Sequence, residues 1–151
     1  MIGMQLASNC RNSLSGGLAA NAAASDRKTF PPGIRTRVSL VISSNRPIPP
    51  GALGIEAPIF EIPVTIAKQI DEFDAFVALG CVIKGKTPHF NLISESVVKA
   101  IMDLSIKYKK PIGNGIITCL NKKQAIERAN PNKKNKGGEA AIAVLATLEN
   151  F

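Results

Sequence analysis

The only histidine of the chain, His89, lies in a short polar segment that also contains Lys86 and Thr87. An imidazole accepts and donates protons near neutral pH, so His89 suits general acid–base chemistry. A lysine, a threonine hydroxyl and the backbone N–H groups that follow Gly85 can together bind an anion near a helix start. This combination indicates a phosphate-binding turn beside a proton-transferring group. A lone histidine is more often an ordinary surface or core residue, so the interpretation depends on where the segment lies in the fold.

The residues on either side predict a strand before this segment and a helix after it. Residues 75–83 are continuously apolar, which is typical of a strand buried on both faces of a parallel sheet. Residues 85–87 lack the upstream glycine of a Walker loop, which argues against nucleotide hydrolysis. Beyond His89, one apolar stripe recurs at helical spacing, and its members are Ile93, Val97, Ile101, Leu104 and Tyr108. His89 is therefore predicted at the carboxyl end of a strand, where ligands bind in α/β sheets.

Strand and helix signals alternate through the rest of the chain from residue 59 onward. Pro63 suits the first turn of a helix, and residues 112–120 have the pattern of another buried strand. Asn121 is expected to cap a short helix, with Gln124 as its capping-box partner. A last helix is expected to present one apolar face made of Ala141, Val144, Leu145 and Leu148. This alternation implies right-handed crossovers and a layered α/β fold.

The net charge of +8 at pH 7 raises the question of nucleic-acid binding. The most basic segment, residues 121–137, contains no aromatic side chain on which a base could stack. A run of lysines of this kind is usually a solvated face, so we expect no nucleic-acid partner. No apolar run approaches the ~20 residues that cross a bilayer, so we expect no membrane partner either.

The three cysteines, Cys10, Cys81 and Cys119, form no Cys-x-x-Cys pair. Cys81 and Cys119 lie in apolar, strand-like runs, so we expect buried thiols in the reducing cytoplasm. One histidine and three scattered cysteines provide no ligand cluster, so no metal site is expected.

Three separated segments, taken together, resemble one enzyme family. Residues 57–63 read APIFEIP, residues 78–90 read ALGCVIKGKTPHF and residues 125–141 read AIERANPNKKNKGGEAA. In order and spacing they are similar to the segments of lumazine synthase. That family has a Phe-Glu-Ile-Pro stretch, then Leu-Gly-x-Val-Ile-x-Gly-x-Thr-x-His, a Glu-Arg-Ala helix and an Asn-Lys-Gly turn.

The resemblance implies a transferase of riboflavin biosynthesis. The family condenses 5-amino-6-(ribitylamino)uracil with 3,4-dihydroxy-2-butanone 4-phosphate to give 6,7-dimethyl-8-ribityllumazine. It also implies a flavodoxin-like three-layer α/β/α sandwich with a mainly parallel four-stranded sheet, formed by residues 1–151 as one domain. The partners implied are two small-molecule substrates and further copies of the chain, as a homopentamer or multiples of it. The family uses no cofactor and no metal.

The resemblance also assigns roles to matching positions. His89 matches the proton-transfer histidine, Lys86 and Thr87 match the phosphate-binding turn, and Arg128 matches a phosphate ligand contributed by a neighbouring subunit. Asn114 falls where many members have Phe. The positions that match substrate-binding residues are Ile59, Phe60, Glu61, Cys81, Val82, Ile83, Asn114 and Lys136.

The N-terminal third, residues 1–54, departs from the family pattern. The family's first strand is followed by an aromatic residue that stacks on the pyrimidine, and no aromatic follows either candidate strand here. Only 13 residues separate Asn45 from Ile59, too few for a helix and a second strand. We therefore place the first strand at residues 2–8, a weak helix at 13–25 and the second strand at 37–43.

This departure leaves a second hypothesis open. The chain could be a non-catalytic oligomeric scaffold, or a flavin- or lumazine-binding relative with a degraded pocket. The discriminating feature is whether an aromatic such as Phe30 or Phe60 reaches the pyrimidine position.

Overall fold

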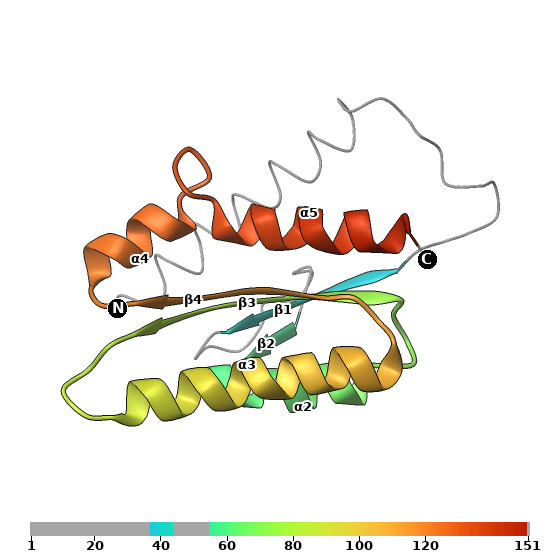
Figure 1. Cartoon of the computed structure of the whole chain (residues 1–151), viewed down its shortest axis with the longest axis horizontal. Helices are drawn as coiled ribbons and strands as arrows, with labels where there is room; N and C mark the ends of the chain where they lie inside the picture. Colours follow the sequence, from blue (N-terminus) through green and yellow to red (C-terminus); the bar gives the residue numbers. More distant parts are fainter. Residues whose placement is uncertain (1–36, 44–54, 151) are drawn as a thin grey trace.

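One of the two inner strands of the sheet, β3 (Ala75–Ile83), matches the apolar run at residues 75–83 and pairs on both sides. The computed structural model describes residues 37–43 and 55–150, which form a three-layer α/β/α sandwich (Figure 1). All strand pairs are parallel, in the spatial order β2-β1-β3-β4. The other strands are β1 (Val38–Ser43), β2 (Ile55–Ala57) and β4 (Ile112–Cys119). The helices are η1 (Ile59–Glu61), α2 (Ile62–Lys68), α3 (His89–Tyr108), α4 (Lys122–Ala129) and α5 (Lys136–Leu148).

The side chains of β3 alternate between two cores, one on each face of the sheet. Phe76 and Ala78 belong to the core beneath α2 and α3. Ala75, Val77 and Leu79 belong to the core beneath α5. Because both faces are covered, nearly every residue of this strand must be apolar, as the sequence predicted.

The apolar stripe of α3 lies on the sheet as predicted. Val97 and Ile101 are buried, and Ile93, Leu104 and Tyr108 pack against the same core. The helix ends at Lys109, whose backbone is left-handed, with φ of 52°.

The next residue, Lys110, precedes β4 and binds the turn between α2 and β3. Its Nζ donates hydrogen bonds to the carbonyl oxygen of Ile70 and, at 2.8 Å, to that of Phe73. An ammonium suits this position because its three N–H donors can bind more than one carbonyl oxygen of the turn. One lysine therefore closes the turn that leads into β3.

Helix α5 lies very close to β4 because the strand has glycines beneath the helix. A Cβ at Gly113 would lie 2.5 Å from the carbonyl oxygen of Ala140, and one at Gly115 would lie 3.3 Å from the Cβ of Ala140. The expected apolar face of α5 is wrong at one position, because Leu145 is 37% exposed. Ala140 packs on the sheet instead, since a small side chain fits the close approach.

The predicted cap of α4 is present. The side chain of Asn121 accepts a hydrogen bond from the Gln124 N–H at 3.0 Å. The Gln124 side chain accepts in turn from the Leu120 N–H at 2.9 Å. The reciprocal bond of Gln124 thus goes to Leu120, one residue before the N-cap Asn121 that a standard capping box would use.

The strand predicted at residues 37–43 is confirmed as β1, which lies between β2 and β3. Among the described strands it is the first rather than the second. The sequence analysis found too little chain between Asn45 and Ile59 for a helix and a second strand together, but a strand of three residues, β2, does lie there. The strand and helix expected at residues 2–8 and 13–25 lie outside the described residues.

Candidate active site

The loop between β3 and α3, residues 84–88, is exposed, and His89 is the first residue of α3. The loop therefore leaves the carboxyl end of a central parallel strand, as predicted. Lys86, Thr87 and His89 are all exposed around the helix start. A helix N-terminus carries partial positive charge, so an anion is favoured at this place.

Gly85 has no structural reason within this loop to lack a side chain. A Cβ added there would meet nothing within 4 Å, and its backbone is outside the left-handed region. The glycine thus leaves open space beside Lys86 and Thr87. That space permits close approach of a ligand to the backbone.

The segment η1 lies beside this loop at the same edge of the sheet. It contacts both β3 and α3. Ile59 packs against the same core as Val82 and Ile93. Phe60 and Glu61 are exposed, Phe60 by 55%. The structure therefore brings η1, the end of β3 and the start of α3 together.

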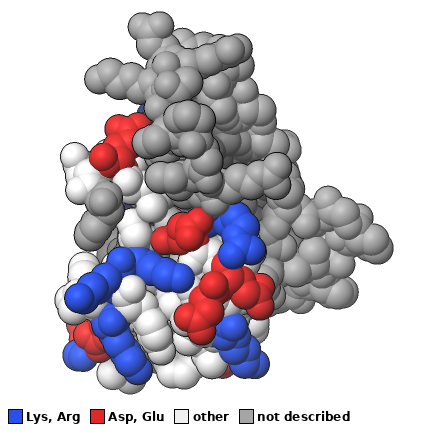
Figure 2. All heavy atoms as spheres, turned by 90° about the vertical axis from the view of Figure 1, so that its right-hand side faces the viewer, with Lys and Arg blue, Asp and Glu red and all other residues white. Residues whose placement is uncertain are grey.

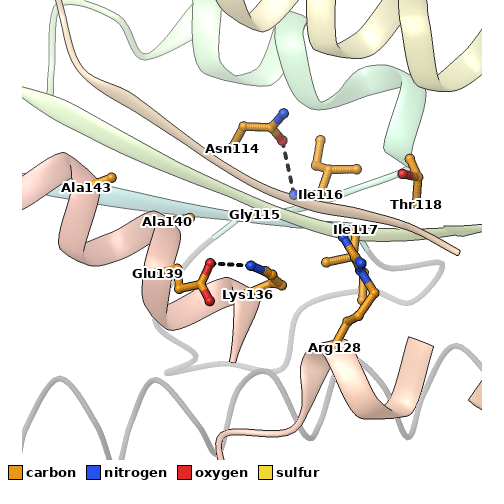
Figure 3. Close-up of a pocket in the computed structure, with 10 residues that line it drawn as sticks. All are labelled: Asn114, Gly115, Ile116, Ile117, Thr118, Arg128, Lys136, Glu139, Ala140 and Ala143. Carbon is orange, nitrogen blue, oxygen red and sulfur yellow. Dashed lines mark hydrogen bonds and ion pairs between the residues drawn. The ribbon is translucent and has the colours of Figure 1, made fainter. Parts of the chain in front are cut away.

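A second group of candidate residues lines a cavity of about 320 Å³ along β4 (Figure 3). Arg128 of α4 and Lys136 of α5 both belong to it. Asn114 is also part of its wall, and its side-chain oxygen accepts a hydrogen bond from the Ile116 N–H at 3.1 Å. The other lining residues are Gly115, Ile116, Ile117, Thr118, Glu139, Ala140 and Ala143.

Two of the charged side chains in this cavity form an ion pair, and the third, Arg128, has a buried nitrogen without a hydrogen-bond partner among the described residues. The Lys136 Nζ lies 2.5 Å from a carboxylate oxygen of Glu139. The Nε of Arg128 is buried and has no hydrogen-bond partner among the described residues. A buried unpaired donor is costly, so this guanidinium is suited to receive an anionic ligand.

The candidate residues thus fall into two groups, since the cavity that contains Arg128 and Lys136 does not include Lys86, Thr87 or His89. The three positions at the end of β3 are divided between the faces: Val82 points to the α3 side, and Cys81 and Ile83 to the α4 side.

The sequence analysis expected both Cys81 and Cys119 to be buried, and the structure agrees for only one of them. Cys119 is buried, but Cys81 is only half-buried. Burial raises the pKa of the Cys119 thiol, and this effect exceeds the opposing influences of the Arg128 charge and a hydrogen bond with Cys81. The proximity of Cys119 to Arg128 could not be seen from sequence, since only the fold juxtaposes the end of β4 and α4.

Glu139 is the charged residue of the cavity lining that the sequence analysis did not identify. The signal was available, because an acid three residues after a lysine on a helix forms an ion pair.

Charge on the surface is mixed on the face shown in Figure 2, which is the end of the molecule away from the 84–88 loop. Basic and acidic side chains, blue and red, are interspersed there across the described part of the surface.

Within residues 37–43 and 55–150, no group of three or more His, Cys, Asp or Glu could hold a metal ion. No helix in the described part of the chain is long and apolar enough to cross a membrane.

These features define a class of protein: a flavodoxin-like α/β/α sandwich with charged and polar side chains gathered around the carboxyl ends of its parallel strands. Comparison with known proteins gives the family. The sequence pattern of the 6,7-dimethyl-8-ribityllumazine synthase family matches residues 57–151. The chain belongs to this family, and the first hypothesis of the sequence analysis is confirmed to that extent.

Individual relatives agree with this assignment. A protein named 6,7-dimethyl-8-ribityllumazine synthase 1 from Rhodopseudomonas palustris is 47% identical over 106 residues, covering 66% of this chain and 61% of the relative. The synthase of Cutibacterium acnes is 46% identical over 91 residues, covering 59% and 55%. That of Agrobacterium fabrum is 45% identical over 107 residues, covering 66% and 68%. The matched part of the chain thus spans between about half and two thirds of each relative's length.

Proposed function

We propose that the chain catalyses the condensation of 5-amino-6-(ribitylamino)uracil with 3,4-dihydroxy-2-butanone 4-phosphate to 6,7-dimethyl-8-ribityllumazine. The observation that carries the proposal is the position of His89. It begins α3 directly after an exposed loop with Lys86 and Thr87, at the carboxyl end of the inner strand β3. This is where ligands bind in α/β sheets.

His89 transfers protons during Schiff-base formation and loss of phosphate, since an imidazole changes charge near neutral pH. Lys86 and Thr87 bind the phosphate, and the open space at Gly85 lets the phosphate oxygens reach the backbone N–H groups. Arg128 supplies a planar fork of donors to the same anion. Its buried, unpartnered Nε supports this role.

The uracil substrate is bound between η1 and the end of β3. Phe60 is the exposed aromatic of η1 and is available to stack on the ring. Glu61 accepts hydrogen bonds from the ribityl hydroxyls, and the backbone of residues 81–83 contacts the heterocycle. Ile59 lines the same side, and Asn114 approaches from the β4 cavity. Lys136 lines that cavity together with Arg128, so it lies near the bound phosphate of the substrate.

The two groups of residues meet between neighbouring copies of the chain, in a homopentamer or a multiple of it. In a cyclic ring each subunit presents one surface to one neighbour and a different surface to the other. The outer face of α3 supports an interface, because Val98, Met102 and Ile106 are exposed large apolar residues one helical turn apart.

The remaining elements of the proposal follow from the chemistry. The reaction needs no cofactor or metal, because proton transfer and phosphate binding suffice. We place the protein in the cytoplasm, a reducing compartment in which thiols such as Cys81 and Cys119 stay reduced. Residues 1–151 form one domain, to which the divergent residues 1–54 contribute.

The direct test is incubation of the purified full chain with both substrates. Lumazine fluorescence and phosphate release are followed together, with a His89→Ala variant as control. Lumazine and phosphate that form in equal amounts, at a lower rate in the variant, support the synthase. Binding of a lumazine or flavin without turnover would favour the non-catalytic relative, and neither binding nor turnover would favour the scaffold.

A further inference from the structure

We propose that Glu139 is an internal counter-anion, which competes with the phosphate of the ligand for Lys136 and so promotes phosphate release. The inference rests on the proposed function, because it concerns the same phosphate. Lys136 and Glu139 both line the β4 cavity, and their charged atoms are 2.5 Å apart (Figure 3). A phosphate that binds Lys136 therefore competes with a carboxylate for the charge and the N–H donors of this ammonium.

The charge balance of the cavity shows why this matters. Arg128 and Lys136 contribute two positive charges and Glu139 one negative charge, so the lining carries a net charge of +1. A phosphate monoester carries about −1.5 to −2 charges at neutral pH. Without Glu139 the lining would carry +2, and the released inorganic phosphate would be held more tightly. The carboxylate thus lowers the affinity for a product that must leave in every turnover.

The start of α5 favours a negative charge at Glu139, whose side chain is more exposed than that of Lys136. Glu139 lies in the first turn of α5, where the helix dipole favours a negative charge. The side chain of Asn135 caps that turn by accepting from the Gly138 N–H at 3.2 Å. Lys136, by contrast, has a long flexible stem whose tip can move between two anions. Glu139 acts through Lys136, so it is a positioning residue.

The test compares Glu139→Gln with a charge-matched control, Glu127→Gln. Glu127 pairs with Lys134 at 3.3 Å and is not part of the cavity lining. Inorganic phosphate binding to the full chain is measured by titration calorimetry, and KM and kcat are measured separately. Exposed ion pairs have modest energies, so we expect Glu139→Gln to bind phosphate about two- to fivefold more tightly. KM for the phosphate substrate should fall without a rise in kcat, Glu139→Asp should restore weaker binding, and Glu127→Gln should resemble the wild type.

Unchanged or weaker phosphate binding in a folded Glu139→Gln variant would overturn the inference, as would equal tightening in Glu127→Gln. If Glu139→Gln does not fold, Glu139→Ala makes the same comparison. An Arg128→Ala variant shows whether only the inferred role of Glu139 is wrong or whether the proposed function is wrong as well. If Arg128→Ala loses phosphate while Glu139→Gln is unchanged, only the role of Glu139 is wrong. If Arg128→Ala binds phosphate as the wild type does, the cavity is not the phosphate site and the proposed function loses that assignment.

Discussion

His89 and Arg128 lie in opposite outer layers of the sandwich. His89 begins α3, which shares one face of the sheet with α2, whereas Arg128 belongs to α4 on the other face (Figure 1). The sheet separates the proposed proton-transfer group from the proposed guanidinium of the phosphate site. This arrangement favours a site assembled from two subunits.

Mixed assembly tests that arrangement. His89→Ala and Arg128→Ala proteins should each be nearly inactive, and co-assembly in equal amounts should restore activity. Each site receives each intact residue with a chance of one half, so about one quarter of sites should be whole in a closed ring. The subunits must be co-expressed or unfolded and reassembled together. No recovery in proven mixed rings would place both residues in the same chain's site.

Replacement of His89 by alanine should slow turnover by ~10²-fold, the low end for loss of a general acid–base group. The side chain is exposed, so the free energy of unfolding should not change. Steady-state rates and thermal unfolding of the same preparation check both points. An unchanged rate would make His89 an ordinary surface residue.

Gly113→Ala should destabilise the fold by about 1–3 kcal/mol, because the new methyl group would overlap the backbone of α5. Gly85→Ala is the matched control, since its methyl group would meet nothing within 4 Å. Denaturant unfolding of the two variants gives the comparison. Equal stabilities would mean that α5 can move away from β4 at little cost.

Cys119 should react with alkylating reagents much more slowly than Cys81. Cys119 is buried, and burial raises the pKa of its thiol, so less thiolate forms at a given pH. Because folding raises this pKa, the folded state holds the thiol proton more tightly than the unfolded state does. The resulting contribution to the free energy of unfolding is complete below the ordinary thiol pKa, and it is lost as the pH rises through the raised value. Peptide mapping after timed alkylation between neutral and alkaline pH measures the reactivity. Faster labelling of Cys119 than of Cys81 in folded protein would contradict the structure.

The sequence predicted the elements that have strong periodicity. The span of β3, the apolar stripe of α3 and the cap of α4 at Asn121 were all confirmed, because burial and local hydrogen bonding act at fixed spacings. Leu145 was misplaced because the helical period alone cannot say how closely α5 approaches β4. Two glycines far earlier in the chain determine that distance.

The candidate site was predictable only in part for a similar reason. The turn before His89 is contiguous in sequence, so its place at a strand end could be inferred from the neighbouring pattern. The pairing of Lys136 with Glu139 and the unpartnered Nε of Arg128 depend on how α4 and α5 lie over β4. The short β2 was missed because three residues are too few to show a periodicity.

The alternation of β3 between two cores also bears on how the chain is made on the ribosome. Ala75, Val77 and Leu79 are covered by α5, which is synthesised well after β3, whereas α2 has already emerged when β3 appears. Until α5 has been synthesised it cannot cover the apolar side chains on this face of β3, and exposed apolar surfaces are prone to aggregate or to recruit chaperones. We expect nascent chains arrested before Ala140 to require a chaperone to stay in solution, and chains that include Val144 to lose that requirement.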